Sequence, residues 1–163
     1  MLFPCDVILQ YLILHVKHLA KFVTLEIEVV DSQSKFRTLL LSSKKSIVSV
    51  IGSRVEVPIL LGEGWQLVKV DLEDLVFKAF GTAYLKTVHI TINSACRLSK
   101  LFMADQVYSD AQLPPHLRVL KSSKKMYLIF STPLLQALTL GSCHWQVQHR
   151  YLIFSLGCNH LNS

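Results

Sequence analysis

The sequence of 163 residues has little of the material that phosphate-binding and zinc-binding motifs require. It contains six glycines and four cysteines, and no two cysteines form a C-x-x-C pair. Nucleotide-binding loops need glycines where a strand turns into a helix, and structural zinc sites need closely spaced cysteine or histidine pairs. The hydrolase motifs G-x-S-x-G and H-E-x-x-H are also missing. We therefore expect no catalytic residue, no metal, no cofactor and no small-molecule substrate.

Long apolar runs are missing as well. No uninterrupted run reaches the roughly 18 residues that a membrane-spanning helix needs. The segment VILQYLILHV is apolar, but Asp6 precedes it and Gln10 interrupts it. It also lacks the basic start and the cleavage site of a signal peptide. We therefore expect no membrane partner, and we expect cysteines that stay reduced.

Acidic residues are few and unevenly placed. All 11 lie between Asp6 and Asp110, whereas the 17 lysines and arginines continue to Arg150, so the formal net charge is +6. A positive excess of this size favours acidic partners, although solubility alone would also explain it. The sign of the charge therefore indicates the class of partner without identifying it.

Apolar residues make up 51% of the sequence, which is enough for a hydrophobic core. Three segments alternate between apolar and polar residues, as half-buried strands do: 22–30, 53–60 and 84–92. Residues 7–16 are almost continuously apolar and predict a buried strand, and Asn93-Ser94 predicts a turn into a strand over 96–103. Seven or eight short strands without regular helix alternation predict a mainly β fold, an antiparallel β-sandwich or jelly-roll-like domain.

One short helix is predicted over residues 72–80. Its apolar stripe consists of Leu72, Leu75, Val76, Ala79 and Phe80. Asp71 is the expected N-cap, and Gly81 is the expected stop. Asp71, Glu73 and Asp74 put three carboxylates at the start of the helix, where they would repel a phosphate. The helix therefore caps the sandwich and does not bind a nucleotide.

Two further groups of residues could suggest a binding site, but we expect none at either. Six aromatic residues, Trp65, Phe77, Phe80, Tyr84, Phe102 and Tyr108, could stack on bases or sugars, but at helix and strand spacing we expect them in the core. His144, His149 and His160 lie near Cys143 and Cys158. Their spacing matches no familiar zinc-ligand pattern, so we predict no metal there. Residues 122–163 are apolar with no clear period, and we predict a domain of residues 1–121 followed by a tail of residues 122–163.

A long stretch of this sequence carries a family resemblance. It is GWQLVKVDLEDLVFKAFGTAYLKTVHITINSACRLSKLFMADQVYSDAQLP, from Gly64 to Pro114. Residues 9–120 resemble the C-terminal two-thirds of the cilia- and flagella-associated protein 20 domain family. The matching positions are Gly64, Trp65, Asp74, Ala79, Phe80, Gly81, Thr82, Tyr84, Thr87, Cys96, Arg97, Asp105, Tyr108, Ser109, Leu113 and Pro114. Lys17, Lys21, Thr24, Leu25, Glu26 and Asp31 fit upstream.

The resemblance implies a small, basic, non-catalytic β-sandwich of cilia and flagella. It also implies the setting of the family's founding member, which sits inside axonemal doublet microtubules near the inner junction, contacts tubulin and neighbouring junction proteins, and associates with basal bodies and centrioles. A nuclear, transcription-linked role with nucleic acid as the partner is the alternative. Because tubulin is acidic, Lys78, Lys86, Arg97 and Lys100 are candidate contact residues, although each is also explained as a solvated surface charge.

Three departures from the family pattern are expected to matter. The opening strands of the family are missing, Ser99 stands where the family tends to carry another basic residue, and residues 122–163 have no counterpart. Without the opening strands, we expect exposed sheet edges. These features resemble those of a truncated or variant paralogue, and a non-functional fragment is therefore a further alternative.

Overall fold

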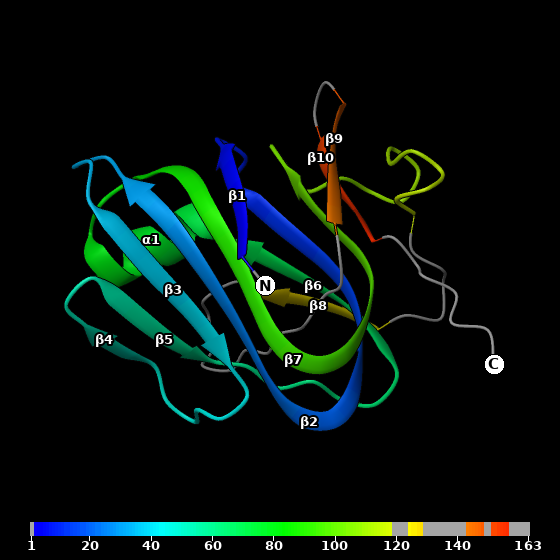
Figure 1. Cartoon of the computed structure of the whole chain (residues 1–163), viewed down its shortest axis with the longest axis horizontal. Coiled ribbons are helices and arrows are strands. Elements are labelled where there is room, and N and C mark those ends of the chain that lie inside the picture. The colour runs from blue at the N-terminus through cyan, green and yellow to red at the C-terminus, as the bar shows by residue number, and fades with distance from the viewer. Residues whose placement is uncertain (1, 119–123, 129–142, 149–150, 157–163) are drawn as a thin grey trace.

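The computed structural model describes residues 2–118, 124–128, 143–148 and 151–156. The described part is mainly β, with one short helix, which confirms the predicted fold class (Figure 1). In chain order the elements are β1 (Leu2–Val7), β2 (Tyr11–Asp31), β3 (Phe36–Ser42), β4 (Ser49–Ile51), β5 (Arg54–Pro58), β6 (Trp65–Asp71), α1 (Leu72–Phe80), β7 (Tyr84–Ala104), β8 (Lys124–Leu128), β9 (Cys143–Gln148) and β10 (Tyr151–Leu156).

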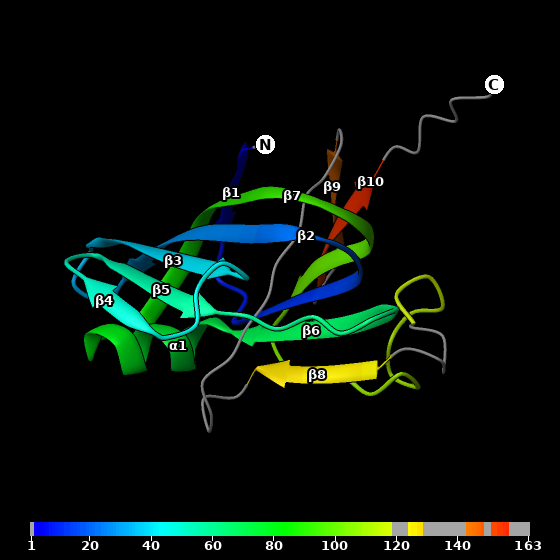
Figure 2. The same ribbon diagram turned by 90° about the horizontal axis from the view of Figure 1, so that it is seen from below.

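Two long, bent strands organise the molecule. β2 and β7 pair antiparallel along their whole length, from Tyr11↔Ala104 to Asp31↔Tyr84. Both strands bend, so that the two halves of each strand lie in different layers (Figures 1 and 2). The first half of β2 pairs with β6, whereas its second half pairs with β3. The main strand order is β4-β5-β3-β2-β7-β10-β9, and the pairing is antiparallel except for β3–β5 and β6–β8. The sandwich therefore forms largely by bending one hydrogen-bonded network.

The predicted division of these two strands is wrong. We expected separate strands over 7–16 and 22–30, and a turn at Asn93-Ser94 between two further strands. The structure instead pairs Asn93 with Thr24 and Ser94 with Val23, inside continuous strands. The register shifts between His18 and Val23, so residues 19–22 face a single residue of β7. Such an irregularity bends both strands without ending their pairing.

The main core lies between the layers. Leu12, Leu14 and Val16 point into it from the first half of β2. Alternate residues of the second half also point into it: Val23, Leu25, Ile27 and Val29. This confirms the alternation predicted for residues 22–30. The helix α1 covers one end of the core with Leu72, Leu75 and Val76, all buried. Because Leu12, Leu14 and Val16 face the main core, the side chains between them point to the opposite face of β2.

Both predicted helix ends are confirmed. The Asp71 side chain accepts a hydrogen bond from the Asp74 amide at 3.1 Å, as an N-cap does. Gly81 has φ +68° and its amide donates to the Phe77 carbonyl at 2.8 Å, which ends the helix. The helix therefore has the bounds that its sequence pattern predicts.

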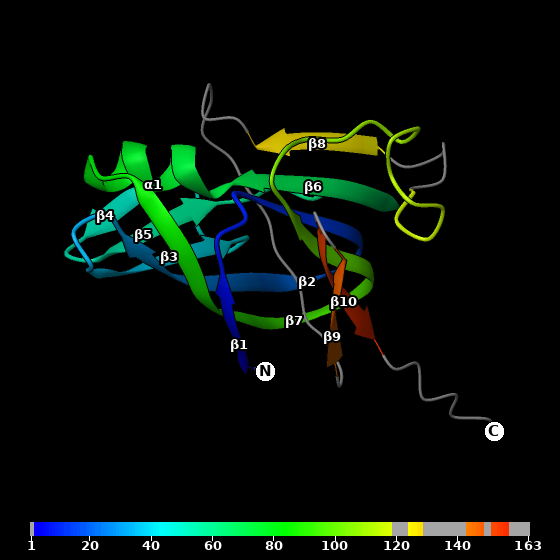
Figure 3. The same ribbon diagram turned by 90° about the horizontal axis from the view of Figure 1, so that it is seen from above.

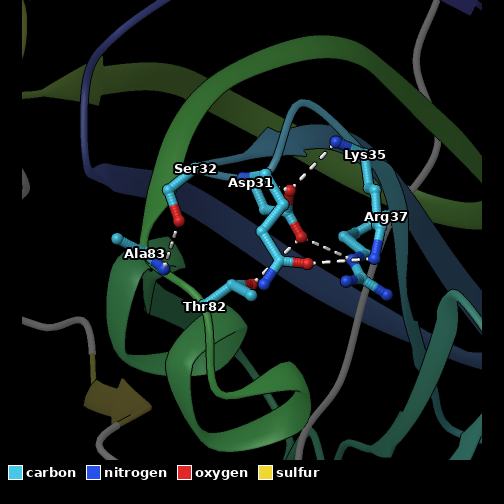
Figure 4. Close-up of polar contacts among 7 residues, drawn as sticks. Asp31, Ser32, Lys35, Arg37, Thr82 and Ala83 are labelled. Carbon is cyan, nitrogen blue, oxygen red and sulfur yellow. Dashed lines mark hydrogen bonds and ion pairs between the residues drawn. The ribbon is translucent and has the colours of Figure 1, made fainter.

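Asp31 joins the β2–β3 turn to the segment that follows α1 (Figure 4). Its carboxylate is fully buried and accepts hydrogen bonds from the Gln33 and Lys35 amides, both at 2.9 Å. The Arg37 guanidinium donates at 2.8 Å and the Thr82 hydroxyl at 3.1 Å. Burial alone would raise the pKa of Asp31, but the hydrogen bonds from Lys35, Arg37, Gln33 and Thr82 lower it to about 2. Asp31 is therefore a structural ion.

Three strands fall within the predicted tail, where we read no regular pattern. β8 pairs parallel with β6 and lies on the side of β6 away from β2 (Figure 3). β10 pairs antiparallel with the last residues of β7 and with β9. The remainder of the tail, including His149 and Cys158, lies outside the described residues. The division into a domain of residues 1–121 and a tail of residues 122–163 stays a prediction.

Candidate docking surface

The face of the first half of β2 that points away from the main core carries the candidate docking surface. We call it the outer face. On β2 it consists of Tyr11, Ile13, His15 and Lys17, because successive side chains of a strand alternate between faces. Ile13, Leu67 and Phe102 form a second apolar cluster there, together with Ala104, Leu113 and Leu117. Residues 105–118 cover part of this cluster, and among the described residues of this face Arg97 is exposed and Lys17 and Lys100 are half-buried.

Three basic residues lie side by side on the outer face. Lys17 of β2 is directly opposite Arg97 of β7, and Lys100 is opposite His15. We call Lys17, Arg97 and Lys100 the basic row. Among the described residues, neither Lys17 nor Arg97 forms an ion pair. Like charges directly opposite each other destabilise a strand pair by about 0.2–1 kcal/mol, so the row has a cost that an acidic partner would offset.

A β-bulge creates this row. His15 pairs with Lys100, but Val16 pairs with Leu98, so Ser99 is an extra residue in β7. Arg97 and Lys100 are three positions apart and would face opposite sides of a regular strand. The extra residue brings both onto the outer face. Ser99 stands where the family tends to carry another basic residue, and it is this extra residue that puts Arg97 and Lys100 on one face.

An aromatic pair borders the row. Trp65 of β6 is the register partner of Lys17, and its ring stacks on the His15 ring with centroids 4.8 Å apart. Burial, and then the nearby Lys100 ammonium, lower the pKa of His15. Burial also lowers the pKa of Lys100, whose ammonium donates to the Arg118 carbonyl of the covering segment. The row is therefore bordered on one side by a flat, largely uncharged ring surface.

The structure brings together two of the four predicted contact residues. Arg97 and Lys100 lie in the basic row, but Lys78 and Lys86 do not. Lys78 is on α1 and forms an ion pair with Asp74 at 2.8 Å. Lys86 is opposite Val30, near the other end of β7. The sequence prediction missed Lys17 because it ended the first strand at residue 16, which placed Lys17 outside the alternating pattern.

The aromatic prediction is partly correct. Phe102 is buried, with 3% of its surface exposed, and Phe80 and Tyr84 pack against the main core. Phe77 is 62% exposed, so the prediction of a core position is wrong for this residue. It lies on the side of α1 away from Leu75 and Val76, outside the apolar stripe of the helix. One exposed ring on a helix does not form the concave aromatic surface that a sugar site needs.

The described residues form neither a metal-binding cluster nor a long apolar helix. They contain no group of three or more His, Cys, Asp or Glu side chains placed to hold a metal ion. None of the helices found among them is long and apolar enough to span a membrane. The one described carboxylate whose pKa falls to about 2, Asp31, is already held by four donors.

Comparison with known proteins agrees with the resemblance in the sequence. Residues 5–121 match the model of the CFA20 domain. Cilia- and flagella-associated protein 20 of Paramecium tetraurelia is 31% identical over 111 residues, which cover 68% of this chain and 58% of the relative. The proteins of the same name from Chlamydomonas reinhardtii and Caenorhabditis elegans are each 28% identical over 111 residues, which cover 58% and 55% of their lengths. The chain thus spans little more than half the length of these relatives, and it belongs to the CFA20 domain family.

Proposed function

We propose that this chain is a non-catalytic structural protein of cilia or flagella that docks on the acidic surface of tubulin. In this proposal it binds axonemal doublet microtubules from the inside, near the inner junction, beside neighbouring junction proteins. Basal bodies and centrioles are further sites of the same kind. The names of the relatives support the ciliary setting. The observation that carries the proposal is the basic row, three cations on one face of the sheet.

Charge complementarity explains why such a row suits a static docking role. Lysine and arginine side chains on one face steer and orient an acidic partner. Lys17 and Arg97 form no ion pair within the described residues, so they are available to pair with carboxylates of a partner. An acidic surface would also remove the repulsion between these two opposite cations. The bent strands hold the row in place before binding, so little conformational entropy is lost.

Co-sedimentation with taxol-stabilised microtubules tests the proposal. The full chain should pellet with microtubules at low salt and dissociate as the salt concentration rises. Each exposed charge pair contributes up to about 1 kcal/mol, so Lys17→Glu combined with Arg97→Glu should weaken binding about tenfold. Lys35→Glu combined with Lys44→Glu is the matched control, because both lysines are exposed and lie elsewhere on the surface. Equal pelleting of both double variants would contradict the proposal.

A second candidate function is a nuclear, nucleic-acid-associated role. The partly exposed Trp65 ring beside the basic row favours it, because single-stranded nucleic acid binds to surfaces that combine cations with aromatic rings. This function requires that affinity for an oligonucleotide falls steeply as salt rises. A salt-independent or undetectable interaction would leave tubulin as the better supported partner.

A further inference from the structure

A hollow lies on the outer face next to the basic row. It has a volume of about 330 Å³ and is bounded by the second apolar cluster and by the covering segment of residues 105–118. Its floor consists of Ile13, Leu67, Phe102 and Ala104, each at least 96% buried, and the buried Lys69 of β6 lines it as well. Val107, which is 45% exposed, stands at its rim. Hollows at this lower end of the size range of ligand pockets accept single aromatic or large aliphatic groups.

The hollow is continuous with the basic row. Phe102 and Lys100 are two residues apart on the same face of β7, a separation of about 7 Å along the strand. Ile13 and His15 are related in the same way on β2. Along β2 and β7, the side chains on this face therefore change from apolar residues to cations within a few positions.

We propose that the hollow and the basic row together form a docking site for an extended, acidic segment of a partner protein that carries an aromatic side chain. The aromatic ring enters the hollow, and carboxylates next to it in sequence pair with Lys100, Arg97 and Lys17. This inference rests on the proposed docking function and specifies the partner's chemistry. Charge complementarity selects the acidic flank, and the apolar floor selects the ring.

The acidic side chains near the hollow give the site a direction. Asp110 lines the hollow, and Asp105 follows Ala104 at the end away from the row. Asp105 accepts a hydrogen bond from the Tyr108 hydroxyl at 2.6 Å and stays exposed. Asp105 would repel carboxylates of a bound segment at this end. The segment should therefore be acidic on one side of its aromatic residue and uncharged on the other.

A labelled peptide with three glutamates, a phenylalanine and three serines is the probe. Its affinity for the full chain, measured by fluorescence anisotropy, should exceed that of the same peptide with alanine in the centre about tenfold. A peptide with three glutamates on both sides of the phenylalanine should bind no more tightly than the one-sided probe. Equal affinities for the phenylalanine and alanine peptides would overturn the proposal, as would tighter binding of an oligothymidine of similar length.

Two variants locate the binding of the aromatic ring. Val107→Trp places a large ring over the mouth of the hollow, and Val50→Trp is its matched control, because Val50 is 49% exposed on β4. Ala104→Leu fills the hollow from the floor, and its melting temperature reports whether it folds. Val107→Trp should reduce the preference for phenylalanine over alanine to less than twofold, while Val50→Trp retains it. A preference that survives in Val107→Trp would contradict the site.

The same variants separate this inference from the proposed function. Arg97→Ser should weaken the phenylalanine and alanine peptides equally, about threefold, because it removes charge without altering the hollow. If Val107→Trp pellets normally with microtubules and the peptides show no preference, the docking function holds and the hollow is not used. If the peptides show the preference but neither the wild type nor any variant pellets, the hollow is a docking site for another acidic partner.

Discussion

Replacing Asp31 by asparagine would remove the buried charge that joins the β2–β3 turn to the segment after α1. Asparagine keeps one acceptor oxygen for the Gln33 and Lys35 amides, but its amide group would point a donor at the Arg37 guanidinium, which can only donate. The Thr82 hydroxyl can accept from that amide group, so the variant loses the bond to Arg37 together with the negative charge. Because a hydrogen bond to a charged group contributes about 1.5–3 kcal/mol, we expect the free energy of unfolding at pH 7 to fall by about 3 kcal/mol.

The pH dependence gives this prediction a second, independent measurement. The pKa of Asp31 is about 2 in the folded chain, below its ordinary value of 3.8, so the unfolded chain binds more protons between these two pH values. The carboxylate therefore stabilises the fold fully above about pH 4, and this stabilisation is lost as the pH falls through about 2. The difference between wild type and Asp31→Asn should thus shrink across this window.

Urea unfolding followed by tryptophan fluorescence at several pH values measures both effects. Asp105→Asn is the matched control, because Asp105 is exposed and accepts a single hydrogen bond. It should change the free energy of unfolding by less than about 1 kcal/mol. An Asp31→Asn variant as stable as the control at pH 7 would show that the buried carboxylate does not stabilise the fold. A deficit at pH 2.5 equal to that at pH 7 would show that the ionisation of Asp31 is not its cause.

Three further substitutions test individual features. Gly81→Ala should lower the free energy of unfolding by about 1 kcal/mol in urea unfolding. The cause is backbone strain at φ +68° alone, because an added Cβ meets no atom within 4 Å, and an unchanged stability would contradict this. Tyr84→Phe should lower the free energy of unfolding by about 1–2 kcal/mol, because the Tyr84 hydroxyl lies 3.0 Å from the Val7 carbonyl and 2.9 Å from the Thr87 hydroxyl. Equal melting temperatures would contradict this. Lys17→Ser should raise stability by a few tenths of a kcal/mol while weakening microtubule pelleting about threefold, and a drop in stability would show that Lys17 is structural.

Local features of this fold could be predicted from the sequence because nearby residues determine them. The cap of α1, its apolar stripe and its glycine stop all lie between Asp71 and Gly81, and the structure has them where they were expected. The alternation in residues 22–30 likewise follows from one strand having one buried face. Asn93-Ser94 is the opposite case, since its local turn chemistry is overridden by pairing with β2, about 70 residues away.

Several of the matching family residues hold structural positions, whereas Lys17, Trp65 and Arg97 lie in or beside the basic row. Asp31 and Thr82 share a hydrogen bond, Gly81 ends the helix, and the Tyr84 hydroxyl contacts Val7 and Thr87. These residues explain why the chain adopts the family fold. They do not by themselves identify a docking surface, because a buried ion or a helix stop serves any partner equally well.

The basic row could not be predicted from the sequence, because its geometry depends on one extra residue. Alternation along a regular strand would place Arg97 and Lys100 on opposite faces, and a strand ending at residue 16 leaves Lys17 out altogether. Only the pairing of β7 with β2 shows that Ser99 is the unpaired residue between them. The same bulge puts Lys100 on the same face as Phe102, and hence next to the hollow. The residue that departs from the basic pattern of the family is therefore the one that aligns the cations with the apolar floor, so that a single segment can contact both.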